Sequence, residues 1–507
     1  MSSKILPEPL LFELSDAGLR NDYLPPLDVP ESAWPFEKRT ELALPEVDEH
    51  SIVRHFTRLS QLNFNIDTEF YPLGSCTMKY NPKLNEAVAA LPGFANVHPL
   101  QDESSAQGWL KVLWEAQETL AKIAGLDAAT VQPLAGAQGE FCGLLMIRKY
   151  FESRGELATR TRIVVPDSAH GTNPASAARC GFAVMSIASD ARGCVDMKAM
   201  RAAMGPDVAG VMMTNPNTLG VWEKDIELIT ALAHEHGALV YMDGANMNAI
   251  VGQVRPGDTG IDVMHFNVHK TFSTPHGGGG PGAGPVAVRA LLEPFLPAPH
   301  VIKDGDRFRF DYDRPDSIGR LHGFHGNAGI ILRALTYIAR HGEAGLKEVS
   351  GDAVLAANYV LARLKDVYAT GSDERCKHEC VLSASELKAK YGVTAWDIAK
   401  RLPDYGFHAP TVYFPTIVKE SMMIEPTETE TKKTLDAFCD AMLSIAREAA
   451  SDPDLLHNAP HTTPVGRLDE ANAARCLNLC WTKPIEQEAD EQGEGDGKRE
   501  VAGASTY

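Results

Sequence analysis

One lysine lies where a lysine side chain can do covalent chemistry. Lys270 follows the apolar run Val263-Met-His-Phe-Asn-Val268 and precedes Thr271-Phe-Ser-Thr-Pro-His-Gly-Gly-Gly-Gly-Pro281. Lysine is seldom buried without a partner or a chemical role, and in a cleft near other cations it can lose its proton and form a Schiff base. A surface lysine at the end of a strand is the competing interpretation.

Polar residues follow each of four candidate strands, which we expect at residues 162–165, 210–214, 238–242 and 263–268. The residues that follow include, in chain order, His170, Asn215, Asp243 and Lys270. Ligands of open α/β sheets bind outside the carboxyl ends of the strands, so these four side chains are expected to converge on one crevice.

Asp243 ends an apolar strand, where an unpaired carboxylate is costly. A protonated pyridine nitrogen is a suitable partner, and it turns the ring into an electron sink. A helix cap or a structural salt bridge is the alternative. His170 could stack on a flat ring or act in acid/base chemistry, although a lone histidine is more often a hydrogen-bonded core residue.

The segment Ala135-Gly-Ala-Gln-Gly-Glu140 introduces a predicted helix over 140–151. Backbone N–H groups on Gly136, Ala137 and Gln138 at a helix start could bind a phosphate monoester. The segment lacks the spacing of a Walker A loop or a dinucleotide fingerprint, and a simple tight turn remains possible. The run Gly277–Gly280 requires either extreme turns or a close approach of the backbone to a ligand or subunit.

The elements that must position these residues alternate between helix and strand from about 105 to 290. Helical spacing over 108–123 and 140–151, with buried strands between helices, predicts a doubly wound α/β domain. We expect an N-terminal arm over 1–85, a large domain over 86–330, a smaller α+β domain over 331–483, and an acidic, disordered tail over 484–507.

Composition limits the class of protein. The 507 residues are 44% hydrophobic, carry a formal net charge of −19 and include nine cysteines. We expect no leader peptide and, since no uncharged apolar run reaches roughly 18 residues, no membrane span. We also expect reduced thiols in the cytoplasm. The negative charge argues against nucleic-acid binding. The pairs Cys376/Cys380 and Cys476/Cys480 have zinc-like spacing, but plain buried thiols are the preferred interpretation, and we expect no metal site.

Several motifs together resemble one known family, the glycine decarboxylase P-protein of the glycine cleavage system. They are Tyr71-Pro-Leu-Gly-Ser-Cys-Thr-Met-Lys79, Ser168-Ala-His-Gly-Thr-Asn-Pro-Ala-Ser176, Asp243-Gly-Ala-Asn-Met-Asn248, His269-Lys-Thr-Phe272, His276-Gly-Gly-Gly-Gly-Pro281, Ser317-Ile-Gly319, Gly326-Asn327, Met423-Ile-Glu-Pro-Thr427 and Asn458-Ala-Pro-His-Thr-Thr463. The likeness covers nearly the whole chain except the tail. The family occurs as one long chain or as two subunits, and the 507 residues of this chain resemble subunit 2, the catalytic half of the two-subunit form.

The resemblance implies a fold-type-I architecture that binds pyridoxal 5′-phosphate (PLP), with a mostly parallel sheet in the large domain and a smaller α+β domain. It implies an oxidoreductase that decarboxylates glycine and passes the aminomethyl group to the lipoyl disulfide of H-protein. A non-catalytic subunit 1 is the implied partner, in an α2β2 heterotetramer.

The resemblance also carries over residue roles. Lys270 is the Schiff-base lysine, Asp243 the partner of the pyridine nitrogen and His170 the residue that stacks on the ring. We expect the wider cofactor-binding set to add Gly136, Ala137, Gln138, Asn215, Ala245 and His269, and a substrate loop to contain Ser75, Cys76 and Thr77. The alternatives are another fold-type-I enzyme, such as a desulfurase or an aminotransferase, or a non-catalytic subunit that only docks H-protein.

Overall fold

The structure is a computed structural model that describes residues 8–19, 25–30, 35–37, 44–277, 282–477 and 479. It contains two compact units, Met1–Gly466 and Arg467–Tyr507. The described part of the second unit holds one helix, α15 (Glu470–Arg475). The predicted acidic tail, Cys480 and three glycines of the run at 277–280 lie outside the described residues.

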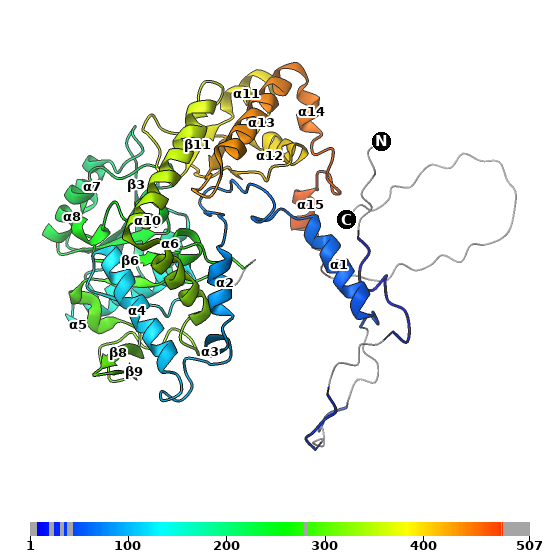
Figure 1. The fold of residues 1–507 in the computed structure, drawn as a ribbon. Helices are drawn as coiled ribbons and strands as arrows, with labels where there is room; N and C mark the ends of the chain where they lie inside the picture. Colours follow the sequence, from blue (N-terminus) through cyan, green and yellow to red (C-terminus); the bar gives the residue numbers. More distant parts are fainter. Residues whose placement is uncertain are drawn as a thin grey trace, which may run out of the picture. The chain divides into compact units, whose positions relative to one another are not determined.

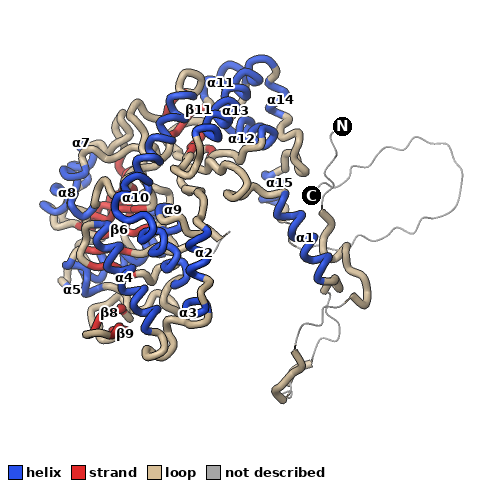
Figure 2. The backbone as a smooth tube through the Cα atoms, viewed as in Figure 1, coloured by secondary structure: helices blue, strands red, loops and turns tan. Residues whose placement is uncertain are grey.

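A seven-stranded sheet forms the centre of the first unit (Figures 1 and 2). Its strands follow the order β1 (Ala128–Thr130), β7 (Val286–Val288), β6 (Val263–Phe266), β5 (Leu239–Gly244), β4 (Val208–Thr214), β2 (Arg162–Pro166) and β3 (Ala183–Ile187). Neighbours from β6 to β3 pair in parallel, and β7 runs antiparallel to both β6 and β1. The predicted α/β class and all four predicted strands are confirmed.

One predicted boundary is wrong. The fourth strand was expected to run to Val268, but β6 ends at Phe266 and the chain turns at once into the short helix α9 (Val268–Thr271). Lys270 therefore lies in a helical turn beyond the strand. The reason is that Asn267 leaves the ladder, and its carbonyl accepts the backbone N–H groups of Lys270 and Thr271.

Helices cover both faces of the sheet, as two apolar cores require. One core joins the sheet to α4 (Gln107–Ala124), α7 (Met197–Ala203), α8 (Ile226–Glu235) and the first half of α10 (Ala328–Leu364). The other lies against α5 (Gly136–Ser153) and α6 (Thr172–Arg179). Helix α5 packs closely against β5 because residue 143 is a glycine. A Cβ at this position would come within 2.3 Å of the Tyr241 ring.

The long helix α10 changes direction at Gly342. Its φ of 62° is positive, and glycine adopts such a value without the steric cost that other residues meet. Its second half packs against a four-stranded antiparallel sheet, in the order β10 (Ala369–Thr370), β11 (Cys380–Ser383), β13 (Ser421–Ile424) and β12 (Thr411–Val412). Helices α11 (Ser385–Tyr391), α12 (Ala395–Arg401), α13 (Lys432–Ser451) and α14 (Pro453–His457) complete this region. Cys376 and Cys380 are buried in its core.

The segment before the large sheet carries α1 (Glu49–Gln61), α2 (Lys83–Ala89) and α3 (Pro92–Ala95), and the hairpin β8 (His300–Asp304) and β9 (Arg307–Asp311) packs near α4. Between α1 and α2 the polar loop pairs with the end of β13, because Leu73 forms a bridge with Ile424 and the Gly74 N–H donates to the Met423 carbonyl at 3.2 Å. A Cβ on Gly74 would clash with Met423 at 2.2 Å. The division into four domains stays a prediction.

No helix among the described residues is long and apolar enough to cross a membrane.

Candidate functional site

The register of the large sheet brings three strand ends together. Thr214 at the end of β4 pairs with Asp243 of β5, and Asp243 pairs with His265 of β6. The side chains that follow these strands therefore start from one edge, as the sequence predicts.

Asp243 is 1% exposed, and its carboxylate is held by protein donors. Oδ2 accepts from Asn173 Nδ2 at 2.9 Å and from Thr214 Oγ1 at 3.4 Å, while Oδ1 accepts from the Ala245 N–H at 2.9 Å. Burial by itself raises the pKa of Asp243, but the nearby His265 and these hydrogen bonds outweigh burial and bring the pKa below its usual value. The carboxylate is therefore held ionised in the core.

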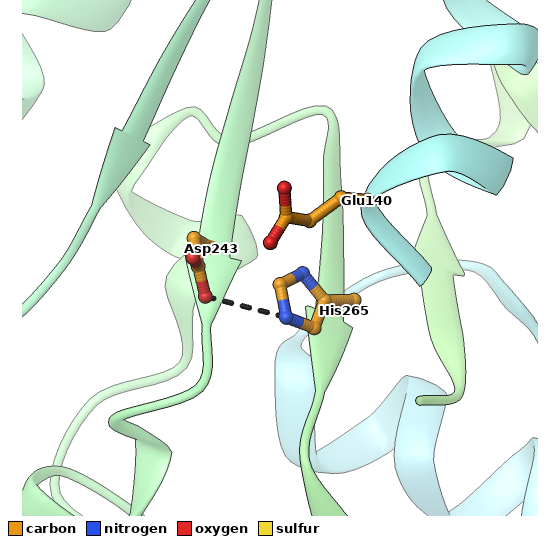
Figure 3. Close-up of side chains that lie close together, drawn as sticks. All are labelled: Glu140, Asp243 and His265. Carbon is orange, nitrogen blue, oxygen red and sulfur yellow. Dashed lines mark ion pairs between the residues drawn. The ribbon is translucent and has the colours of Figure 1, made fainter. Parts of the chain in front are cut away.

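His265 and Glu140 lie together beside Asp243 (Figure 3), and neither was among the site residues predicted from the sequence. His265 Nε2 lies 3.3 Å from Asp243 Oδ1, and its Nδ1 lies 2.8 Å from the Tyr241 hydroxyl. Burial lowers the pKa of His265, so the ring is neutral. The proton then belongs on Nε2, facing the carboxylate, while Nδ1 accepts from Tyr241.

Glu140 points from α5 towards the same pair, and one oxygen of each carboxyl group and one ring nitrogen of His265 lie within 4.8 Å of one another. Burial, and then the charge of Asp243, raise the pKa of Glu140 to about 7, against hydrogen bonds from Thr172 Oγ1 at 2.5 Å and Ser176 Oγ at 2.7 Å. Two carboxylates this close cannot both be ionised cheaply, so Asp243 keeps the charge and Glu140 keeps a proton over much of the acidic range.

Lys270 is 7% exposed. Among the residues that the structure describes, none forms a hydrogen bond or an ion pair with its Nζ. Its charge acts on the imidazoles of His170 and His265 and on the carboxyl groups of Glu379 and Glu425. An amine that is buried, free of direct partners and surrounded by titratable groups is suited to covalent attachment of a carbonyl compound.

The predicted substrate loop reaches Lys270 of its own chain. Ser75 N–H donates to Glu379 at 2.7 Å, Thr77 N–H donates to Glu425 at 2.9 Å, and the Cys76 thiol lies within the field of Lys270. Ser75 and Thr77 adopt φ values of 64° and 50°, which non-glycine residues rarely hold without external support. The two buried carboxyl groups provide that support.

The start of α5 has the form that a phosphate monoester requires. The N-cap Ala135 has no capping side chain, and the first intrahelical bond runs from Gly139 N–H to its carbonyl. The N–H groups of Gly136, Ala137 and Gln138 therefore precede the helical ladder and can donate to an anion. Gly136 is needed because a Cβ there would come within 2.1 Å of the Asn267 amide oxygen.

The remaining predicted residues lie around the same edge. His170 is half-buried, its backbone N–H donates to Thr214 Oγ1 at 2.9 Å, and it lines a cavity of about 190 Å³ with Phe414. Asn215 is fully buried and its Nδ2 has no partner among the described residues. Nor has Nδ1 of His269, a ring that faces His276 with centroids 5.1 Å apart.

Comparisons with known proteins agree with this geometry. Residues 94–297 match the family "Aminotransferase class-V", and residues 349–461 match "Glycine dehydrogenase, C-terminal domain". Among solved structures, a glycine decarboxylase P-protein of the glycine cleavage system in inhibitor-bound form superposes with a TM-score of 0.67 at 22% identity, covering 85% of this chain and 94% of that one. A cysteine desulfurase from Thermococcus onnurineus gives 0.59 at 17% identity, covering 76% and 98%.

These similarities show the fold, and with the lysine, carboxylate and helix start at one sheet edge they define the class: a fold-type-I enzyme whose cofactor is PLP. Closer relatives are proteins named probable glycine dehydrogenase (decarboxylating) subunit 2. The one from Chloroherpeton thalassium is 53% identical over 494 residues, covering 96% of this chain and 99% of its own. The one from Methylococcus capsulatus is 57% identical over 451 residues, covering 88% and 92%. The chain belongs to the glycine dehydrogenase (decarboxylating) subunit 2 family.

The residues present fit the cofactor. PLP needs an amine for its aldehyde, an anion for its protonated ring nitrogen and N–H donors for its phosphate. Lys270 has the free amine, Asp243 the ionised carboxylate, and residues 136–138 the donors. The unpartnered Nδ2 of Asn215 is a further donor. The individual assignments of site residues stay predictions.

The raised pKa of Glu140 gives a stability test on the cofactor-free chain. The pKa of Glu140 is higher in the folded state than in the unfolded state. The contribution of protonated Glu140 to the stability of the folded state is therefore complete below about pH 4.5 and is lost as pH rises through about 7. The glutamine in Glu140→Gln cannot titrate. We therefore expect the free energy of unfolding of this variant, relative to that of wild type, to rise by up to about 3 kcal/mol between these two pH values, as measured by chemical unfolding. The control is Glu152→Gln, on an exposed residue of the same helix. Parallel curves for wild type and Glu140→Gln would contradict the assignment.

Proposed function

We propose that this chain decarboxylates glycine with PLP held by Lys270, and that the aminomethyl group passes to the lipoyl disulfide of an H-protein. The observation that carries the proposal is the buried amine of Lys270, free of direct partners, at the same sheet edge as the ionised carboxylate of Asp243. Family membership over nearly the full chain supports glycine as the substrate.

When bound, PLP supplies an electron sink for the pair of electrons that CO₂ leaves behind. Asp243 would hold a proton on the ring nitrogen, since its own pKa is kept low. Asn173, Thr214 and the Ala245 N–H fix the carboxylate in place, so that no reorganisation is needed as charge develops. His170 would cover one face of the ring, and the Ser75–Thr77 loop would close the site on the side of Lys270.

Replacement of Lys270 tests the covalent attachment. In Lys270→Ala we expect the visible absorbance of the lysine-bound cofactor to vanish, together with decarboxylation, while phosphate and ring contacts still allow PLP to bind. Borohydride reduction of wild type, followed by peptide mapping, should mark Lys270. A variant that keeps the wild-type spectrum and rate would refute the proposal.

Replacement of Asp243 tests the electron sink. Asp243→Asn keeps the shape of the side chain, and Lys270 can still attach the cofactor, but the charge facing the ring nitrogen is lost. We expect turnover to fall about 10²-fold or more, because a preorganised charge at a developing carbanion is removed. Unchanged turnover, with the cofactor bound, would remove Asp243 from the site.

A partner subunit follows from the family. The relatives are named as subunit 2, which implies a second subunit, and we propose subunit 1, in an α2β2 heterotetramer, as the partner. The described part of the N-terminal arm supports an interface, because it exposes Leu27, Val29, Leu44 and Phe56 by 73%, 64%, 67% and 54%. Exposed apolar side chains gathered in one segment are typical of a surface that another chain covers.

Deletion of residues 1–60 tests the partner. The deletion leaves the Ser75–Thr77 loop and the sheets intact, so we expect the purified chain to keep the lysine-bound cofactor spectrum while co-purification with subunit 1 through high salt and glycine decarboxylation fall together. The double substitution Leu27→Ser with Val29→Ser is a milder version. Full activity of the intact chain with H-protein alone would contradict the partner and leave the cofactor proposal standing.

A further inference from the structure

Two buried carboxyl groups and a histidine form a second titratable cluster, and the charge of Lys270 acts on all three. Glu379 directly precedes β11 and Glu425 directly follows β13, and the antiparallel pairing of Cys380 with Ile424 puts them side by side. One oxygen of each and a ring nitrogen of His378 all lie within 4.8 Å of one another. All three residues are 0% exposed.

The hydrogen bonds of this cluster are incomplete. Both oxygens of Glu425 accept, Oε2 from the Thr77 N–H at 2.9 Å and Oε1 from Asn248 Nδ2 at 3.1 Å. Glu379 Oε2 accepts from the Ser75 N–H at 2.7 Å, but among the described residues its Oε1 has no hydrogen-bond partner and neither ring nitrogen of His378 has one. The nearest approach between them is 3.6 Å, from His378 Nε2 to Glu379 Oε1, which is too long for a hydrogen bond. The loop thus uses one oxygen of Glu379 and leaves the other without a hydrogen bond, although it is buried.

The charges that face the cluster do not allow both carboxyl groups to ionise. Lys270 is the cation that acts on both, and His378 is neutral because burial lowers its pKa to about 3. Burial and then the Glu425 charge raise the pKa of Glu379 well above its usual value, and burial raises that of Glu425. The other titratable neighbours, Cys76 and His276, are neutral, since burial raises the pKa of the thiol and lowers that of the ring to about 4.

We propose that Glu379 and Glu425 share one proton and that Glu379 delivers it through Oε1 to the sulfur that leaves the lipoyl disulfide. The inference rests on the proposed function and adds the proton donor that this reaction requires. The aminomethyl carbon, with the electron pair left by CO₂, forms a bond to one sulfur. The S–S bond breaks, its electron pair stays on the second sulfur, and that sulfur takes the proton from Glu379. Solvent then restores the proton of the pair.

The position of the cluster supports this role. Glu379 and Glu425 support the loop around Cys76 next to Lys270, so a disulfide that reaches the reacting carbon comes close to them. A neutral carboxylic acid has an O–H to give, whereas a lone ionised glutamate has none. Glu140 and Asp243 cannot serve, because Asp243 lies at the strand ends where the ring nitrogen would be held and Glu140 lies against it from α5.

The first experiment asks where the proton is, without any turnover. Infrared spectra of the PLP-loaded complex with its partner subunit are recorded across the pH range for wild type, Glu379→Gln and Glu425→Gln. Glu140 contributes a protonated-carboxyl band that fades as pH rises through about 7 in all these proteins. We expect wild type to show a second such band, which persists above that pH and is lost in both variants. Glu430→Gln is the control, since Glu430 is a half-buried carboxyl group with a raised pKa outside the cluster, and it should keep the band. A second band unchanged in Glu379→Gln and Glu425→Gln overturns the shared proton.

The second experiment follows the thiol that appears when glycine reacts with lipoyl H-protein in a single turnover. Glutamine preserves shape and the acceptor for the loop, so the lysine-bound spectrum should persist while thiol formation falls about 10²-fold or more in Glu379→Gln. The wild-type rate should decline as pH rises through the pKa of the pair, and the variant should lose that decline. A wild-type rate and pH profile in Glu379→Gln overturn the donor.

These outcomes separate the two proposals. If wild type forms no thiol from glycine and shows no lysine-bound spectrum, the proposed function fails, while the infrared band still decides whether the proton is shared. A stoichiometric cation that binds wild type in calorimetry with Zn²⁺ or Mg²⁺, and is lost in Glu379→Gln, would overturn the shared proton, because a metal ion would replace it.

Discussion

The site depends on keeping one carboxylate ionised inside the core. Asp243 is 1% exposed, and an isolated charge at that depth would be strongly unfavourable. Three donors and a neutral imidazole compensate, and each is placed by a different element: Asn173 by α6, Thr214 by β4, the Ala245 N–H by the turn after β5, and His265 by β6. The parallel register aligns Thr214, Asp243 and His265. It is therefore needed to keep Asp243 ionised as well as to form the sheet.

The position of Lys270 in α9 keeps it near the same edge of the large sheet. A strand continued through Val268 would have carried the lysine further along the sheet, whereas the turn at Asn267 brings its backbone back towards the strand ends. Asn267 also packs against Gly136 at the start of α5, so one residue fixes both the lysine and the predicted phosphate donors. Close packing at this point leaves room only for glycine at position 136.

Some strands and site residues could be predicted from the sequence and others could not, for physical reasons that differ from one to the next. The central strands β4 and β5 were found because their residues form uninterrupted apolar runs, but β1 and β7 have three residues each and show no periodicity. The strand β3 was missed because it is an edge strand with exposed side chains. Lys270 and Asp243 stood out as charges at the ends of apolar runs.

Other site residues gave weaker signals. Glu140 was taken as the polar first residue of a helix, although it falls on the same stripe as the buried Gly136, Leu144, Ile147 and Phe151. A charge on an apolar stripe is a signal that could have been used. His265 was hidden inside an apolar strand. Glu379 is joined to Ser75 across 304 residues of sequence, and no local pattern predicts such a contact.

Two buried carboxyl pairs are built on different elements of the fold, and they behave alike. In the first, Asp243 is held ionised by its donors and Glu140 carries the raised pKa. In the second, Glu425 accepts hydrogen bonds at both oxygens, so it is the better place for the negative charge, and Glu379 with its free Oε1 is the better place for the proton. Each pair therefore combines a charge with a retained proton. The charge of the first would stabilise the electron-poor ring, and the proton of the second would be available for the leaving sulfur. Because the pairs are built on separate elements, their pKa values can be set independently. The proposed reaction uses that separation, because it requires a fixed anion and a mobile proton in one site.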